Sequence, residues 1–409
     1  MPSTTPVAPV LNPFRPGAGR MPPYLAGREE EQKEFKRLLA QDVILKNLVL
    51  TGLRGVGKTV LLETLKPIAI TEGWLWIGAD FSESTSVSEE NLCVRLLTDL
   101  SVVSSSLSIS DERSKTIGFG GTATKALNFN GLLEIYHTTP GLVVDKIKNV
   151  LEVTWEQFKK TGRRGIIFAY DEAQNLSDHA AKDQYPLSLL LDLFQSIQTK
   201  DIPFMLALTG LPTLFPKLVE ARTFSERMFR VITLERLNKQ ESMDAIVKPT
   251  EKPSCSFKFR PQTVDLIYQT SGGYPYFIQF ICRELFDAWI QKIDDGENPV
   301  VRMGDIVRKL DTDFFSGRWA KATDRQRELL EVISYLSNCD SEFTVQEVVE
   351  KSRELLTKPF SPSHANQMLS SLCTAGLVYK NRHGKYSFAV PLLGTFIQRQ
   401  ISERQAKDS

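Results

Sequence analysis

The stretch TGLRGVGKTV, residues 51–60, constrains the fold of this chain more than any other feature. It has the spacing G-x-x-x-x-G-K-[ST], which is met by Gly52, Gly57, Lys58 and Thr59. The apolar run NLVLTG (47–52) precedes it and the helical pattern KTVLLETLKPIAI follows it, which is the context of a phosphate-binding P-loop. Glycine is needed here because backbone N–H groups must turn inward around phosphate oxygens without a Cβ in the way.

This loop predicts a nucleotide site with a magnesium ion. We expect Lys58 to reach the β and γ phosphates and Thr59 to ligate Mg²⁺. The candidate nucleotide-binding residues of the segment are Gly52, Arg54, Gly55, Val56, Gly57, Lys58, Thr59 and Val60. A chance glycine-rich turn is the alternative, and the flanking strand and helix argue against it.

A second signal is GIIFAYDEAQN, an apolar strand after Gly165 that ends in Asp171 and Glu172. Two carboxylates directly after a strand buried on both faces are costly unless they bind something, although a solvated strand end is the alternative. Asp171 can hold Mg²⁺ through water, and Glu172 can polarise the attacking water. The pair therefore predicts hydrolysis as well as binding.

Strand and helix patterns alternate through the first half of the chain, which predicts an α/β fold with a parallel sheet covered on both faces. Strands are expected at 47–52, 73–82, 165–170, 204–210 and 230–237, and helices at 88–101 and 186–198. The pattern breaks at about 102–138, where serines and the sequence GFGG indicate an insertion. This insertion, which contains Lys115 and Lys125, is compatible with a β-hairpin at a DNA channel or protomer contact, and equally with a mobile surface loop.

We expect four parts along the chain. They are an extended proline-rich segment (1–23), a core (24–238), a helical lid (239–317) and a C-terminal domain (318–409). In the last part, helices expected at 323–337, 343–356 and 361–376 precede two short apolar runs that flank the turn NRHG. Three helices and a hairpin predict a winged helix.

These motifs resemble those of AAA+ ATPases, in the clade of the origin-recognition replication initiators and the related STAND switch ATPases, over about residues 15–400. The resemblance implies that PPYLAGREEE places Leu25, Gly27 and Arg28 beside the adenine. It also implies that Thr209, in ALTGLP, occupies the position that senses the γ-phosphate. An ordinary threonine at a strand end is the alternative for Thr209.

The resemblance also suggests an arginine that acts on the nucleotide of a neighbouring protomer. EARTFSERMFRVITLERL offers Arg222, Arg227 and Arg230, of which we favour Arg227 and then Arg230, against a solvated basic helix end. In TSGGYPYFIQF the arginine that initiators usually place at this helix start is missing. Gly273-Tyr274-Pro275 instead looks like the STAND arrangement in which Pro275 packs on the base, or like a plain helix start.

The expected winged helix offers candidate DNA contacts. His364, Asn366 and Gln367 lie on its expected recognition helix, and Lys380, Arg382 and Lys385 lie on its wing. Acidic groups are nearly as frequent in this part, and winged helices also dock proteins, so a protein partner stays open.

Composition limits the partners and the compartment. The formal net charge of +1 allows only a local basic patch. The five cysteines include no CxxC pair, which fits reduced thiols and a cytoplasmic protein. No uninterrupted apolar run approaches 18 residues, so we expect neither export nor a membrane span.

Two functions are compatible with the sequence. The first is an ATPase that binds and hydrolyses ATP with Mg²⁺, forms homo-oligomers and binds duplex DNA, in replication, transposition, or a mobile-element or defence context. The intact Glu172 and the candidate arginines favour it. The second is a STAND-type switch that acts on a protein partner, which the missing lid arginine and the Gly-x-Pro element favour.

Overall fold

The computed structural model describes residues 11–41, 43–111, 123–251, 255, 257–296, 300–382 and 384–408. The chain forms two compact units. The first, here called the sheet unit, comprises Arg28–Gly52 and Lys58–Thr233. The second, here called the helical unit, comprises the residues up to Gly27, Leu53–Gly57 and the chain from Leu234 onward. Each unit is described by itself below.

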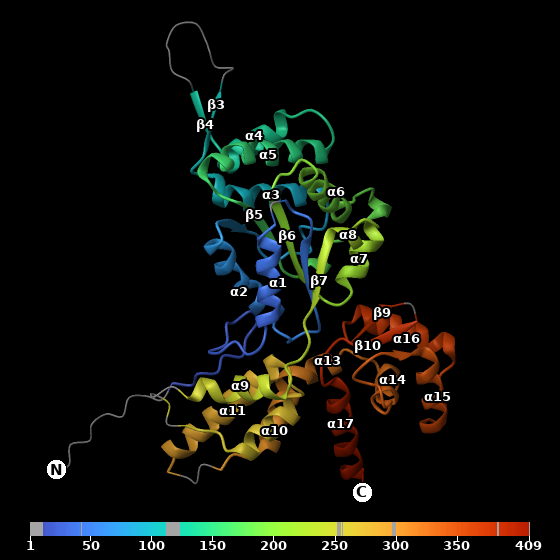
Figure 1. Cartoon of the computed structure of the whole chain (residues 1–409). Helices are drawn as coiled ribbons and strands as arrows, with labels where there is room; N and C mark the ends of the chain where they lie inside the picture. The colour runs from blue at the N-terminus through green and yellow to red at the C-terminus, as the bar shows by residue number, and fades with distance from the viewer. Residues whose placement is uncertain are drawn as a thin grey trace, which may run out of the picture. The chain divides into compact units, whose positions relative to one another are not determined.

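The sheet unit is built on five parallel strands in the order β2-β5-β6-β1-β7 (Figure 1). The strands are β1 (Asn47–Thr51), β2 (Trp74–Ile77), β5 (Gly165–Tyr170), β6 (Phe204–Gly210) and β7 (Phe229–Thr233). Every residue of β1, β5 and β6 is buried, as expected for central strands covered on both faces. The predicted parallel α/β sheet is confirmed.

Two of the expected strands are shorter than predicted. β2 ends at Ile77, where regular pairing with β5 is interrupted at Gly78 and then resumes as a single parallel bridge between Asp80 and Asp171. A Cβ at Gly78, whose φ is 119°, would lie 2.0 Å from the carbonyl oxygen of Ala169. β7 ends at Thr233, and the residues that follow belong to the helical unit.

Helices surround this sheet. They are α1 (Glu29–Leu39), α2 (Lys58–Thr71), α3 (Glu89–Ser104), α4 (Phe129–Thr138), α5 (Val143–Phe158), α6 (Pro186–Gln198), α7 (Leu214–Ala221) and α8 (Ser225–Met228). The helix predicted at 186–198 is found with the same bounds. The helix predicted at 88–101 begins one residue later, after the N-cap Ser88, and continues to Ser104.

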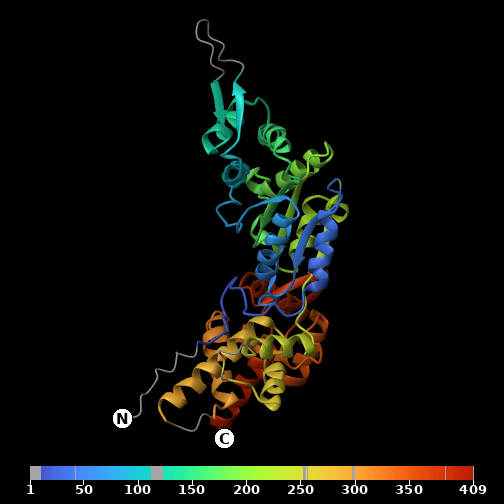
Figure 2. The same ribbon diagram turned by 60° about the vertical axis from the view of Figure 1, so that its left-hand side comes forward.

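The predicted insertion at 102–138 contains more regular structure than expected. β3 (Ser108–Asp111) and β4 (Ala123–Ala126) form an antiparallel hairpin that extends away from the helices of the sheet unit in both views (Figures 1 and 2). Asn128 then caps α4, which buries Leu132 and Tyr136 one turn apart. Residues 129–138 are therefore part of the folded unit and do not form a loop. The GFGG turn and Lys115 lie outside the described residues.

The helical unit begins its long helical run with α9 (Lys239–Val247), α10 (Pro261–Ser271), α11 (Pro275–Asp294) and α12 (Met303–Leu310). A π-helix (Asp311–Ser316) and the short α13 (Gly317–Trp319) continue the chain. The region that follows has α14 (Asp324–Ser334), β8 (Phe343–Thr344), α15 (Val345–Leu355), α16 (Pro362–Thr374), β9 (Val378–Arg382), β10 (Lys385–Phe388) and α17 (Leu393–Asp408). The three strands form an antiparallel sheet in the order β8-β10-β9.

One predicted helix start in this region is wrong. Residues 343 and 344 form a strand paired with β10, and the helix begins at Val345. Thr344 is its N-cap, because the Thr344 side chain and Glu347 satisfy each other's backbone N–H groups in a capping box.

The segment that precedes the core lies on the helical unit of its own chain. Phe14 is fully buried and contacts the ring of Phe259 at a centroid distance of 5.9 Å. The side-chain amide of Asn12 donates to the carbonyl oxygen of Arg283 at 3.0 Å and to Asp287 at 2.7 Å. Residues 11–23 therefore belong to this unit, where the sequence predicted a separate extended segment.

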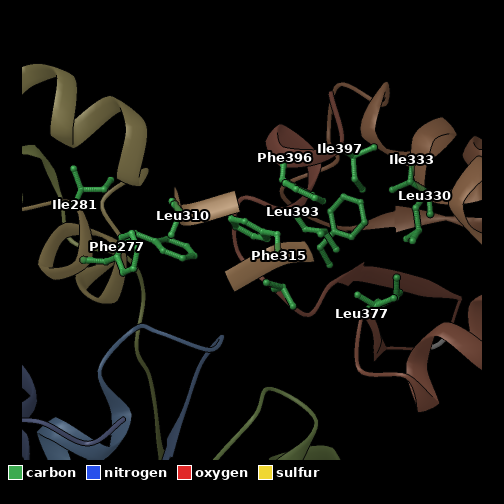
Figure 3. Close-up of a cluster of buried hydrophobic side chains, with 14 of the residues drawn as sticks. Phe277, Ile281, Leu310, Phe315, Leu330, Ile333, Leu377, Leu393, Phe396 and Ile397 are labelled. Carbon is green, nitrogen blue, oxygen red and sulfur yellow. The ribbon is translucent and has the colours of Figure 1, made fainter. Parts of the chain in front are cut away.

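The predicted boundary at residues 317 and 318 does not separate two cores. One continuous apolar cluster joins the expected lid to the C-terminal region, and Figure 3 shows Phe315 between Leu310 and Phe396. The rings of Phe315 and Phe396 are stacked at a centroid distance of 5.0 Å. Because these side chains are buried against each other, the lid and the C-terminal region form one compact unit. Among the described residues, no helix has both the length and the apolar character needed to cross a membrane.

Candidate nucleotide site

The P-loop adopts a backbone that glycine permits. Gly55 and Gly57 have φ values of 80° and 91°, in the left-handed region. A Cβ at Gly57 would meet nothing within 4 Å, so its backbone conformation and not crowding favours glycine. At Gly55 a Cβ would lie 3.2 Å from the Cβ of Tyr276, so this position is also crowded.

The first turn of α2 carries the two polar side chains of the motif. Lys58 Nζ donates to the carbonyl oxygen of Gly52 at 3.0 Å. Thr59 Oγ1 donates to Asp171 Oδ2, across 112 positions of sequence. The fold thus places the hydroxyl predicted to ligate the metal directly beside the predicted metal-binding carboxylate.

The acidic pair lies at the carboxyl end of β5. Asp171 is 5% exposed, and its Oδ1 accepts from the backbone N–H of Glu172 at 2.7 Å. Glu172 has a φ of 50° and an exposed side chain. A hydroxyl and a carboxylate fit Mg²⁺, which prefers oxygen ligands and takes one or two carboxylates together with phosphates. Thr59 and Asp171 are the residues that would hold the ion, which would neutralise phosphate charge.

Thr209 lies inside the sheet, one residue before the end of β6. Its side chain is fully buried, and Oγ1 donates to the carbonyl oxygen of Tyr170 at 3.3 Å. The hydroxyl is thus engaged by the neighbouring strand β5 in this structure.

The three candidate arginines differ in their contacts. Arg222 makes two hydrogen bonds of 2.7 Å to the carboxylate of Asp192, which raise the pKa of Arg222. Arg230 pairs with Glu34 at 2.9 Å. Arg227, in α8, has an exposed side chain that forms no ion pair with any residue the structure describes.

The residues expected beside the base are divided between the units. Leu25 and Pro275 lie in the helical unit and are half-buried. Arg28 lies in the sheet unit at the start of α1, where its Nη1 pairs with Glu31 at 3.1 Å. Pro275 is the first residue of α11.

Tyr276 is a P-loop contact that the sequence did not indicate. Its backbone N–H donates to the carbonyl oxygen of Gly55 at 3.2 Å, directly after Pro275. Its ring lies 5.3 Å from that of Phe314, which in turn lies under the guanidinium of Arg318 at 4.3 Å. The pKa of Arg318 is lowered by burial and then by the positive charge of Arg54. These contacts extend from the P-loop to the helix that leads into the C-terminal region.

The candidate DNA contacts lie on α16 and the β9–β10 hairpin. α16 contains no acidic residue, and His364, Asn366 and Gln367 are exposed on it. The Tyr386 hydroxyl donates to Asn366 Oδ1 at 2.9 Å, so part of that amide is engaged. Lys380 is exposed and Lys385 half-buried, whereas the side chain of Arg382 lies outside the described residues.

Comparisons with known proteins agree with this geometry. Residues 24–219 match a family model described as "AAA ATPase domain", and residues 312–397 match a "Domain of unknown function (DUF8462)". The fold is similar to the Walker-type ATPase PABY2304 of Pyrococcus abyssi, with 15% identity over 91% of this chain and 96% of that chain, at a TM-score of 0.55. It is also similar to the ORC2 protein of Aeropyrum pernix in its ADP form, with 14% identity over 93% of this chain and 96% of that chain, at a TM-score of 0.53. The comparison with curated proteins gave no match.

The fold and the motif together define a P-loop ATPase fold. Residues 24–219 are similar to an AAA ATPase domain, and the fold of the chain is similar to those of the Walker-type ATPase and the ORC2 protein.

Proposed function

We propose that this protein binds ATP with Mg²⁺ and hydrolyses it. The observation that carries the proposal is the contact between Thr59 Oγ1 and Asp171 Oδ2, which brings together a hydroxyl and a carboxylate that can hold a nucleotide-bound Mg²⁺ along with phosphates and water. Glu172 follows directly at the strand end and is the proposed base for the attacking water. Lys58 would release the Gly52 carbonyl and contact the β and γ phosphates.

The remaining nucleotide contacts would come from the loop backbone and from apolar packing. Residues from Gly52 to Val60 would surround the phosphates, with Arg54 at the edge of the loop. Leu25 and Pro275 would pack on the base, with Arg28 nearby. Thr209 is buried near the end of β6, beside the end of β5 that leads to Asp171. Its hydroxyl would sense the γ-phosphate only if it leaves the carbonyl of Tyr170.

We further propose that ATP drives homo-oligomerisation, with Arg227 stabilising the transition state on the neighbouring protomer. A cation that approaches the γ-phosphate lowers the barrier by neutralising charge that develops there. The exposed, unpaired state of Arg227 within the described part of the chain supports this role over Arg222 and Arg230, which are held by Asp192 and Glu34.

Duplex DNA is the proposed partner of the C-terminal region. The order of α14, β8, α15, α16, β9 and β10 is typical of a winged helix, in which the third helix enters the major groove. The uncharged polar face of α16 is suited to base edges, and Lys380, Lys385 and Arg382 would contact phosphates. We propose a cytoplasmic role in replication, transposition, or mobile-element or defence processes.

The decisive experiment measures the steady-state ATPase rate with and without duplex DNA, and the mass of the protein with a non-hydrolysable ATP analogue. We expect DNA to stimulate hydrolysis and the analogue to produce a larger assembly. Lys58→Ala and Arg227→Ala should each lower the stimulated rate by about 100-fold or more. Arg163→Ala, at another exposed arginine, is the matched control and should leave the rate unchanged.

DNA contact is tested separately by replacing Lys380 and Lys385 with alanine. Binding of the variant releases fewer counterions from the DNA, because it makes fewer phosphate contacts. The slope of log K against log salt should therefore fall in magnitude by about 1 per lysine. Lys36→Ala, in α1 of the sheet unit, is the control. An unchanged salt slope in the double variant would exclude these lysines as phosphate contacts.

The second candidate is a switch that acts on a protein partner. The bond from Tyr276 to Gly55, directly after Pro275, favours it because a helical segment is then attached to the nucleotide loop through its backbone. A slow, DNA-indifferent rate from a monomer with bound ADP would support this candidate and contradict the first.

A further inference from the structure

Gln174 is held between the acidic pair and the end of β6. It lies in the single turn of 3-10 helix Ala173–Asn175, and its Nε2 donates to Glu172 Oε2. Its Oε1 accepts from the backbone N–H of Leu211 at 3.2 Å. The approach is close, because a Cβ at Gly210 would lie 2.6 Å from the same Oε1. The amide therefore has one orientation, in which its nitrogen faces Glu172.

Lys217 fixes the turn that carries Gln174. It projects from α7, and its Nζ donates to the carbonyl oxygen of Gln174 at 2.6 Å and to Ser177 Oγ at 2.5 Å. Burial lowers the pKa of Lys217, whereas the nearby Asp178 and Glu220 raise it. The half-buried ammonium group thus donates two hydrogen bonds to the segment that contains the turn.

α7 leads directly to the candidate arginines. Arg222 follows it and is held by Asp192, and its Nη1 donates to Ser188 Oγ at 2.8 Å. α8, with Arg227, comes next. A continuous set of contacts therefore runs from Glu172 through Gln174 and Lys217 to the segment that presents Arg227.

We propose that Gln174 is a positioning residue that restrains Glu172, and that Lys217 makes this restraint depend on the position of α7. The inference rests on the proposed role of Glu172 as the base. The bond from Gln174 occupies one of the two carboxylate oxygens of Glu172 and holds the side chain toward the end of β6, so Glu172 must be released before it can turn to the attacking water. Displacement of α7, when a second protomer engages Arg227, releases Gln174 and frees the base.

Removing the restraint should raise the unstimulated rate. Gln174→Ala should increase kcat of the protein alone, without DNA, by about five-fold, which corresponds to about 1 kcal/mol, the net value of one ordinary hydrogen bond, and leave KM for ATP unchanged. Lys217→Met should act in the same direction, whereas Lys217→Arg should keep a rate close to that of the unchanged protein. Gln346→Ala removes a similar bond to Glu350 on α15 and is the control.

A second measurement does not depend on hydrolysis. Hydrogen exchange at the Leu211 amide should become faster in Gln174→Ala, because that N–H loses its acceptor. Unchanged exchange, or a kcat that stays the same or falls, would overturn the proposal. If the unchanged protein shows no ATPase and Gln174→Ala shows none either, then restraint is not the reason for the inactivity and the inference fails. A normal rate that is lost in Lys58→Ala but unaltered in Gln174→Ala refutes the restraint alone and leaves the ATPase function standing.

Discussion

Each unit contains an arginine–aspartate pair with a nearly buried carboxylate. One pair joins two turns of the same helix, and the other joins two segments that are distant in the sequence. In the sheet unit, Arg95 and Asp99 lie one turn apart on α3, with the Arg95 side chain 29% exposed and that of Asp99 7% exposed. In the helical unit, Asp311 and Arg399 have nearly the same exposure, 8% and 30%, but they are 88 residues apart. Similar chemistry is used locally in one unit and over a long range in the other.

This difference follows from what else holds each unit together. Backbone pairing already fixes distant segments of the sheet unit, since β1 pairs with both β6 and β7. In the helical unit, the π-helix and α17 are joined by side chains, such as the stacked rings of Phe315 and Phe396. Side-chain substitutions at these long-range contacts should therefore have larger effects on stability than a substitution within the local pair.

Phe315→Ala should have the largest effect on stability. The ring is fully buried between the π-helix and α17, and a buried phenylalanine replaced by alanine loses about 4 kcal/mol through lost transfer energy and a cavity. Calorimetry should show a lower unfolding temperature for the transition of the helical unit. Phe168→Ala, fully buried in β5, should lower the transition of the sheet unit by a similar amount. If both variants shift a single common transition, the two units do not unfold independently.

Arg399→Met should have the next largest effect. It leaves the Asp311 carboxylate buried without its bidentate partner, whose Nε lies 2.9 Å from Asp311 Oδ2. We expect a loss of about 2–3 kcal/mol, somewhat less than for fully buried pairs because part of the arginine is exposed. Urea unfolding measures the change. The double variant Asp311→Leu with Arg399→Met should recover part of it, and a double variant that is less stable than Arg399→Met would contradict the buried-charge explanation.

The features that the sequence predicted are local. The buried strands β1, β5 and β6 are continuous apolar runs, and the P-loop spacing is readable without any tertiary contact. Asp171 and Thr59 were expected at one edge of the sheet by the same reasoning, because they follow the carboxyl ends of the parallel strands β5 and β1, which have β6 between them. Their roles in catalysis remain predictions.

The features that the sequence missed depend on distant contacts. The burial of Phe14 is visible only once Phe259 lies beside it, and the shared core requires Phe315 to meet Phe396. Gln174 has no unusual sequence context, since its role arises from the N–H of Leu211 and the close approach of Gly210. One local signal was overlooked. Asn128 is a residue type that favours the N-cap position, and the apolar residues after it indicate the helix α4.

Asp99→Asn should have the smallest effect, and it should depend on pH. Asp99 accepts from Arg95 at 2.9 Å and from the Tyr170 hydroxyl at 3.0 Å, and an asparagine oxygen can still accept from Tyr170. Burial raises the pKa of Asp99, against the opposing influence of Arg95 and Tyr170. The folded protein therefore binds this proton more readily than the unfolded chain does. Its contribution to stability is fully present below the ordinary carboxyl range and is lost as pH rises through the raised pKa.

The substitution removes this titration, so its effect can be separated from that of the lost charge pair. Relative to the unchanged protein, Asp99→Asn should be least favourable below about pH 4 and gain as pH rises toward 7, with a total change within about 1 kcal/mol. Urea unfolding at several pH values measures the difference. A variant that becomes relatively less stable as pH rises would show that the ion pair with Arg95 outweighs burial. In that case the local pair of α3 would stabilise its unit as the long-range pair does, and the contrast between the two pairs would be one of distance alone.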